Sequence, residues 1–286
     1  MKKRYALIPL LLFITTFLNG VNLRVSPETL SKDLTSFKII DVREKENYQK
    51  SHIKNALNFP AQLSYENTNL DGKVTNPNTI QKLLRNLGLN IEDNLVIYDE
   101  GSFFNAARVF WTFEVYGFKN VKLLNAGFKE WESKNFPTSK EIPNIKPSQY
   151  IASVNNNRLS TKFTTQIATK NPQQVIIDAR SYEAYIGEKS VAQRFGHIPK
   201  AIHIPAIHNL SKEESVMKLK NTQSLKDLYK NIEADKKVVI YCAIGKVAAT
   251  NYFALRELGY DVSNYDASWK EWGNDFSLPI ENKSKQ

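Results

Sequence analysis

The chain has 286 residues, of which 42% are apolar and 24% charged, and its formal net charge is +10. This composition supports one or two folded domains and excludes disordered, collagen-like and disulfide-stapled proteins. The single cysteine, Cys242, excludes internal disulfides, cysteine-based zinc sites and two-thiol redox motifs. The lysines and arginines are scattered among acidic residues, so we expect no nucleic-acid-binding surface.

A charged and then apolar amino terminus is typical of a secretory signal. The basic residues at 2–4 precede an apolar run, 5–18, that is short for a membrane span. We therefore expect a signal peptide over 1–20 and an exported protein, either periplasmic or secreted. Because 18–20 fits a cleavage site poorly, an uncleaved amino-terminal anchor stays open. Beyond that anchor we expect no stable membrane insertion.

After the signal, short apolar runs alternate with amphipathic segments. This alternation predicts an α/β fold with mostly parallel sheets flanked by helices. The stretches 37–56 and 175–201 share an apolar run, an Asp-x-Arg pair and a His-Ile turn. Later motifs recur in the same order, since 95–98 resembles 238–241 and 127–131 resembles 268–272. The repeat is too long for a solenoid unit and predicts two complete domains.

The boundary between the two copies is predicted from composition. The stretch 137–157 is polar, contains three prolines and lacks a sustained apolar period. We therefore expect domain 1 over 22–136, a linker over 137–157 and domain 2 over 158–286.

Each copy carries an acid, an arginine and a histidine near its first strand. An Asp-x-Arg pair can close the turn after a strand, so we expect structural ion pairs between Asp41 and Arg43 and between Asp178 and Arg180. His52 and His197 occupy equivalent places, and we expect each to make a turn-stabilising hydrogen bond rather than to act in catalysis.

The copies differ most after the strand 238–241. This strand runs directly into Cys242, a glycine-containing loop and a helix predicted to end at Gly259. Backbone N–H groups and the positive end of the helix dipole would favour the thiolate there. Such a sulfur is a candidate nucleophile. The alternative is that Cys242 is a small buried apolar residue.

These features together resemble the two-domain rhodaneses, the thiosulfate and 3-mercaptopyruvate sulfurtransferases. The resemblance rests on the tandem repeat, on 196–201, on the loop that starts at Cys242 and on 265–273. It implies that Cys242 takes a sulfur atom from a small donor, holds it as a persulfide and passes it to cyanide or a thiol. Neither a metal ion nor an organic cofactor is implied. The loop amides of Ala243, Ile244, Gly245, Lys246 and Val247 would cradle the persulfide.

The resemblance also implies that the first domain is inactive. Asp99 stands where the second copy has Cys242, and a carboxylate cannot form a persulfide. Arg108 and Trp111 resemble an Arg-x-x-Trp feature of the family that we expect to be structural.

The substrate-binding residues depart from the family pattern. Ala184 occupies the position of a family arginine that binds the donor, and the loop sequence matches neither sulfurtransferase type. An anionic donor would then need another cation, for which Lys246 and Arg194 are the candidates.

Two other functions are weighed against sulfur transfer. The phosphatase branch of this fold needs an arginine where this chain has Ala248, which disfavours phosphatase chemistry. The second alternative is a noncatalytic binding or folding-assistance module in which Cys242 is incidental. Cyanolysis with thiosulfate and with mercaptopyruvate would separate that module from an enzyme.

Overall fold

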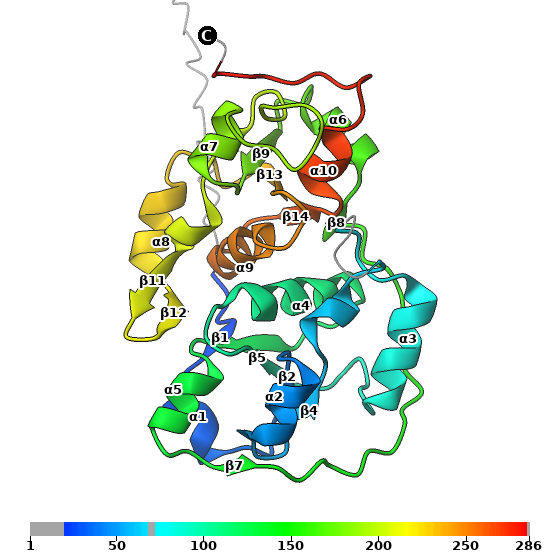
Figure 1. The fold of residues 1–286 in the computed structure, drawn as a ribbon, viewed down its shortest axis with the longest axis vertical. Coiled ribbons are helices and arrows are strands. Elements are labelled where there is room, and N and C mark those ends of the chain that lie inside the picture. Colours follow the sequence, from blue (N-terminus) through cyan, green and yellow to red (C-terminus); the bar gives the residue numbers. More distant parts are fainter. Residues whose placement is uncertain (1–19, 68–71, 285–286) are drawn as a thin grey trace, which may run out of the picture.

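Two five-stranded parallel sheets, one in each half of the chain, organise the molecule (Figure 1). The computed structural model describes residues 20–67 and 72–284. The strand order is β1-β6-β5-β2-β4 in the first sheet and β10-β9-β13-β14-β8 in the second, and every pairing within these sheets is parallel. The predicted α/β fold with two helix-flanked parallel sheets is therefore confirmed.

The elements of the first half, in chain order, are β1 (Arg24–Val25), α1 (Pro27–Lys32), β2 (Lys38–Asp41), α2 (Lys45–Lys50), β3 (His52–Ile53), β4 (Leu57–Asn58), the 3-10 helix η1 (Ala61–Ser64), α3 (Pro77–Asn86), β5 (Leu95–Tyr98), α4 (Phe104–Val115), β6 (Val121–Leu124), α5 (Phe128–Ser133) and β7 (Thr138–Ser139).

The elements of the second half, in chain order, are β8 (Leu159–Ser160), α6 (Lys162–Ala168), β9 (Gln174–Asp178), α7 (Tyr182–Ile186), β10 (Ile202–His203), the 3-10 helix η2 (Ala206–Asn209), β11 (Leu210–Glu213), β12 (Val216–Leu219), α8 (Thr222–Tyr229), β13 (Lys237–Tyr241), α9 (Ala248–Leu258), β14 (Val262–Tyr265) and α10 (Ser268–Trp272).

The middle strand of each sheet ends next to a residue that the sequence analysis singled out. All of β5 and all but the first residue of β13 are buried, as expected for a strand covered on both faces. Asp99 follows β5 and Cys242 follows β13, so both lie at the carboxyl end of a central parallel strand. Ligand sites of open parallel sheets form at this edge.

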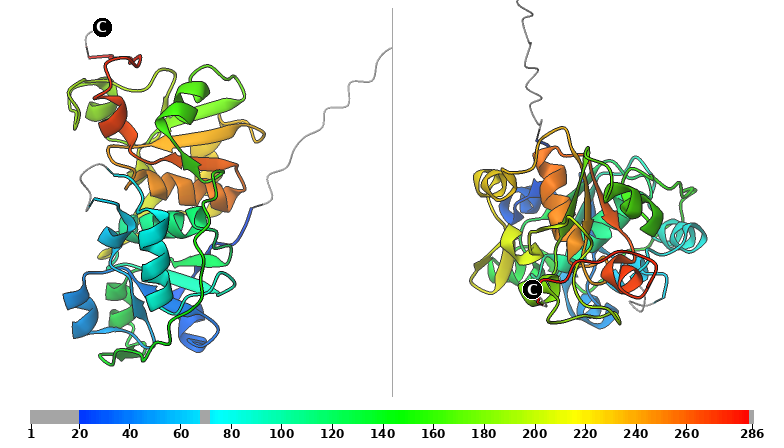
Figure 2. Two further views of the ribbon diagram at one scale, coloured as in Figure 1. Left: turned by 90° about the vertical axis from the view of Figure 1, so that its right-hand side faces the viewer. Right: turned by 90° about the horizontal axis from the view of Figure 1, so that it is seen from above.

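The helices that follow these two strands pack against each other between the sheets. Figures 1 and 2 show α4 and α9 in the middle of the molecule, with one sheet on either side. Both helices are buried on nearly all faces, which explains their apolar composition. The ring centroids of Phe103 and Phe110 lie 5.6 and 4.8 Å from that of Phe253. The two halves therefore share one aromatic core.

The hairpin of β11 and β12 belongs to the second half in sequence but lies against the first half. The amide of Met217 donates to the carbonyl of Gly101 at 2.8 Å, and that of Leu219 donates to the side chain of Asn125 at 2.9 Å. Lys218 forms an ion pair with Glu130. These contacts join the halves a second time.

The predicted linker is attached to the first domain for part of its length. The strand β7 pairs with β3, and the hydroxyl of the buried Tyr150 donates to the carbonyl of Tyr116 at 2.7 Å. The predicted signal peptide, 1–20, lies outside the described residues except for Gly20. In the described part of the chain, no helix is long and apolar enough to cross a membrane.

Candidate active site

Both Asp-x-Arg pairs form the ion pairs that the sequence predicts. The carboxylate of Asp41 accepts hydrogen bonds from the guanidinium of Arg43, and Asp178 and Arg180 repeat this geometry in the second half. The histidine predictions are also confirmed. His52 Nδ1 donates to the carbonyl of Tyr48, and His197 Nδ1 donates to that of Tyr185, both at 2.8 Å.

Cys242 lies at the base of the loop that joins β13 to α9. Its amide donates to Ser268 Oγ at 3.1 Å, and its carbonyl accepts from the amide of Trp269 at 3.0 Å. The residue is only 1% exposed and packs with the apolar core shared by the halves. Its loop neighbours Ala243 and Val247 line a cavity, and Cys242 itself is not part of that lining.

Gly245 allows the loop to turn tightly beside Cys242. Its φ of +69° lies in the left-handed region, and a Cβ there would lie 2.4 Å from the carbonyl oxygen of Asp266. Its own carbonyl accepts hydrogen bonds from Asn264 Nδ2 and from Arg108 Nη1, both at 3.1 Å. The loop is thus held from both halves of the chain.

Arg108 is the residue of the first half that holds this loop. Its guanidinium also donates to the carbonyls of Ser64 and Gly72, each at 3.2 Å, and is sandwiched by the rings of Tyr65 and Trp111. The side chain is fully buried on α4. The structural role predicted for Arg108 and Trp111 is therefore confirmed, and it extends across the domain interface.

Two titratable residues near Cys242 were missed by the sequence analysis. The hydroxyl of Tyr65 is buried and makes no hydrogen bond to another described residue. Burial raises the pKa of Tyr65, and the charges of Cys242 and Asp266 act in the same direction. Burial also raises the pKa of Asp266 to about 6, although its carboxylate accepts from the amide of Val74 at 2.7 Å. No local motif marks Tyr65, and Asp266 lies in the run 265–273 without a feature that would single it out, because folding brings each residue to the site.

The raised pKa of Asp266 predicts a pH-dependent stability. Between pH 4 and 6 the unfolded chain releases this proton and the folded chain keeps it, so the free energy of unfolding should fall as the pH rises. The expected loss is about 1 to 3 kcal/mol. Asp266→Asn should remove this slope in urea titrations over that range, whereas equal slopes for both proteins would contradict the assignment.

The nucleophile position of the first half is occupied by a hydrogen-bonded anion. The carboxylate of Asp99 accepts from the backbone amides of Gly101, Ser102, Phe103 and Ala106 and from the Ser102 hydroxyl. By contrast, the backbone amides from Ala243 to Val247 donate no hydrogen bond to any residue described by the structure. Among the described residues, the N–H groups of the second loop have no acceptor, whereas those of the first loop surround a negative charge.

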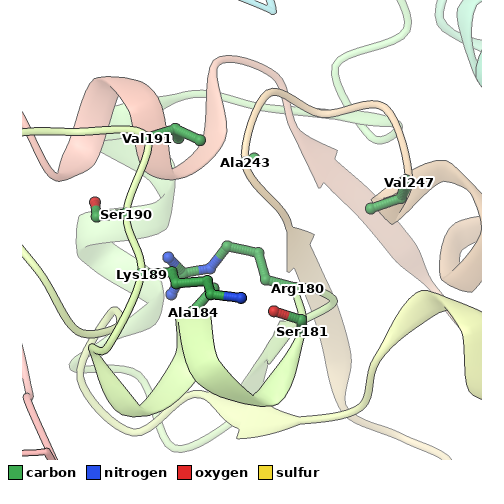
Figure 3. A pocket seen from close by; sticks show the side chains of 8 residues that line it. All are labelled: Arg180, Ser181, Ala184, Lys189, Ser190, Val191, Ala243 and Val247. Carbon is green, nitrogen blue, oxygen red and sulfur yellow. The ribbon is translucent and has the colours of Figure 1, made fainter.

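A cavity of about 290 Å³ lies against the outer side of the second loop. Figure 3 shows the side chains that line it, which are Arg180, Ser181, Ala184, Lys189, Ser190, Val191, Ala243 and Val247. Ala184, identified from the sequence as the missing cation position, is among them. Lys189 supplies a cation that the sequence analysis did not single out, and Lys246 is not part of this lining. Ile244 instead lies against Gly72 of the first half.

Arg194 does not serve the role expected for it. Its guanidinium donates to the carbonyls of Trp272, Gly273, Asp275 and Leu278. Four acceptors use most of its donors, so the side chain holds the carboxyl-terminal loop instead of facing the cavity. The proposal that Arg194 replaces the cation missing at Ala184 is therefore wrong.

Within residues 20–67 and 72–284, no group of three or more His, Cys, Asp or Glu side chains could hold a metal ion. The described groups at and beside this loop include the sulfur of Cys242, backbone amides without an acceptor among the described residues, and the two cations of the cavity.

Comparison with known proteins identifies relatives along most of the chain. A protein of Haloferax volcanii named "Putative thiosulfate sulfurtransferase" is 31% identical over 268 residues, covering 89% of this chain and 92% of its own length. The "Sulfur carrier protein TtuD" of Thermus thermophilus is 32% identical over 215 residues, covering 70% of this chain and 74% of its own.

Solved structures agree with this relationship. SseA from Escherichia coli, described with the 3-mercaptopyruvate sulfotransferases, aligns with a TM-score of 0.76 at 25% identity, covering 87% of this chain and 99% of its own. An anaerobic ergothioneine biosynthesis enzyme from Chlorobium limicola aligns with a TM-score of 0.79 at 20% identity, covering 93% and 71%, which shows a shared fold alone. The Rhodanese-like domain model matches residues 26–134 and 161–275. With one match in each half, the chain belongs to the rhodanese family as a tandem two-domain member.

Proposed function

We propose that this protein is a sulfurtransferase that carries a sulfur atom as a persulfide on Cys242. The donor is a small molecule such as thiosulfate or 3-mercaptopyruvate, and the acceptor is cyanide or a thiol. The names of the relatives from Haloferax volcanii and Escherichia coli support this chemistry. The first domain forms one wall of the site through Arg108, Tyr65 and Gly72.

The comparison between the two loops carries the proposal. In the first half, the carboxylate of Asp99 lies at the end of the central strand and accepts hydrogen bonds from the backbone N–H groups around it. In the second half, Cys242 stands at the equivalent place and the amides of Ala243 to Val247 have no acceptor among the described residues. A thiolate or persulfide anion at Cys242 would satisfy these donors as the Asp99 carboxylate does.

The proposed reaction balances without an external oxidant or reductant. The Cys242 thiolate attacks the outer sulfur of the donor and forms a new S–S bond. With thiosulfate the old S–S bond breaks and sulfite leaves with the electron pair. With 3-mercaptopyruvate the C–S bond breaks, and the carbon takes the electron pair and then a proton to give pyruvate. The acceptor next attacks the outer persulfide sulfur and releases the Cys242 thiolate.

A mass measurement tests this function. The peptide containing Cys242 should gain one sulfur atom after incubation with thiosulfate or 3-mercaptopyruvate and lose it after addition of cyanide. The burial of Cys242 favours the alternative, a noncatalytic binding or folding-assistance module. If neither donor labels Cys242, that alternative replaces the enzyme.

We infer that the protein is exported to the periplasm or secreted. The inference rests on the basic residues at 2–4 and the apolar run 5–18. Amino-terminal sequencing of protein from a fractionated host should find a processed chain outside the cytoplasm that begins near residue 21. An intact amino terminus in the cytoplasmic fraction would contradict export, and an intact one at the membrane would indicate an uncleaved anchor.

A further inference from the structure

We propose that Arg180, through its Nη1 atom, and Lys189 bind the carboxylate of an organic sulfur donor in the cavity beside the Cys242 loop. This inference rests on the proposed sulfur transfer and names the donor class and the residues that select it. It is drawn from a comparison of the two halves of the chain, which carry the same arginine in different surroundings.

The arginines of the two Asp-x-Arg pairs make nearly the same contacts. Arg43 binds Asp41 and donates to the carbonyl of Ser51, and Arg180 binds Asp178 and donates to the carbonyl of Gly196. They differ at one nitrogen. In the first half, Arg43 Nη1 donates to the carboxylate of Glu100 at 3.0 Å. In the second half, Arg180 Nη1 is buried and has no partner among the residues that the structure describes.

The missing partner corresponds to a single substitution between the copies. Glu100 follows Asp99 as Ala243 follows Cys242, and the backbone confirms the equivalence. The carbonyl of Glu100 accepts from the amide of Lys129 at 3.4 Å, and that of Ala243 accepts from the amide of Lys270 at 3.0 Å. Alanine at 243 thus offers no acceptor where the first half holds a carboxylate, and Ala243 lines the cavity together with Arg180.

A buried guanidinium N–H without a hydrogen-bond acceptor costs free energy, so this position favours the binding of an anion. Arg180 is only 5% exposed, and a charge-assisted hydrogen bond is strong at such a site. Lys189 adds a second positive charge to the same cavity, as Figure 3 shows, and it forms no ion pair with another described residue. The two cations replace the family arginine that is absent at Ala184.

The remaining walls select an organic donor over an inorganic one. Ala184, Val191, Ala243 and Val247 present apolar surface to the cavity. Ser181 and Ser190 complete the lining. A carbon skeleton can contact the apolar walls, whereas thiosulfate has no carbon atoms to bury against them. The site therefore fits a small carboxylate that carries a thiol, for which 3-mercaptopyruvate is the probe.

Binding measured without turnover tests the proposal. In the Cys242→Ser protein, calorimetry should detect binding of 3-mercaptopyruvate that is tighter than binding of thiosulfate. Adding Ala243→Glu places a carboxylate beside Arg180, as in the first half, and should weaken 3-mercaptopyruvate binding about tenfold or more. Ala243→Gln has nearly the same volume without the charge and should weaken it less. Lys189→Met, at an exposed position, should also weaken it about tenfold.

Matched controls separate this proposal from sulfur transfer itself. Glu100→Ala changes the equivalent position of the first half and should leave donor binding unchanged. The proposal is overturned if Ala243→Glu and Ala243→Gln weaken binding equally, if Lys189→Met has no effect, or if thiosulfate binds more tightly than 3-mercaptopyruvate. Labelling of the wild-type Cys242 by thiosulfate would still support the proposed function in each of these cases.

Discussion

Replacing Cys242 with serine is expected to lower the rate of thiocyanate formation from cyanide by about a thousandfold or more. A serine hydroxyl is a far weaker nucleophile than a thiolate and cannot hold the transferred sulfur as a persulfide. The rate is measured with purified protein at saturating thiosulfate and at saturating 3-mercaptopyruvate. The same samples are analysed by mass spectrometry, in which the serine variant should gain no sulfur.

A stability measurement separates loss of chemistry from loss of structure. Cys242 is buried in the shared core, and serine is close to it in size, so the variant should remain folded and lose at most a few kcal/mol of stability. Urea denaturation checks this directly. A folded serine variant that still turns over either donor at the wild-type rate would refute the assignment of Cys242 as the nucleophile.

Gly245→Ala is expected to reduce sulfur transfer about a hundredfold, because it displaces the loop that surrounds the sulfur. The new Cβ would approach the carbonyl oxygen of Asp266 to 2.4 Å and Arg108 Nη1 to 3.1 Å, and the φ of +69° disfavours any side chain. The loop must shift to relieve these contacts. Steady-state kinetics should show the loss mainly in kcat, since the cavity residues Arg180 and Lys189 are not altered.

Gly117→Ala is the matched control for this experiment. Gly117, on the turn after α4, also has a positive φ, +91°. An added Cβ there would meet Ile91 at 3.4 Å and the carbonyl oxygen of Ser153 at 3.7 Å, both ordinary contact distances. It should cost about 1 kcal/mol of stability and leave the kinetics unchanged. Equal kinetic losses in the two variants would show that backbone strain, and not the geometry of the Cys242 loop, sets the rate.

Most of the fold was predictable because its signals are local. The apolar runs of β5 and β13, the Asp-x-Arg turns and the repeat of both in one order indicate two similar parallel sheets. The place of Cys242 also followed from local sequence, because a residue that ends a central strand and precedes a helix lies at the carboxyl edge of the sheet.

The rest of the site could not be predicted, because it depends on contacts between distant segments. Tyr65 belongs to no motif and reaches the Cys242 loop only when the halves pack together. Asp266 lies in the run 265–273, but its place beside the loop depends on the pairing of β14 with β13, and its contact with Val74 depends on the packing of the halves. Arg194 was a plausible anion ligand by charge and position, but four nearby carbonyls of the carboxyl-terminal loop bind it. Lys189 was overlooked because an exposed lysine has no sequence signal that distinguishes it from its neighbours.

The two halves cannot be separated without loss, because the hairpin of β11 and β12 and the pairing of α4 with α9 join them. Cutting the chain at its midpoint would leave Phe103, Phe110 and Phe253 facing water on the separated pieces and would strip the hairpin of its acceptors at Gly101 and Asn125. Each half therefore completes the buried interior of the other, and neither is expected to fold as a separate piece.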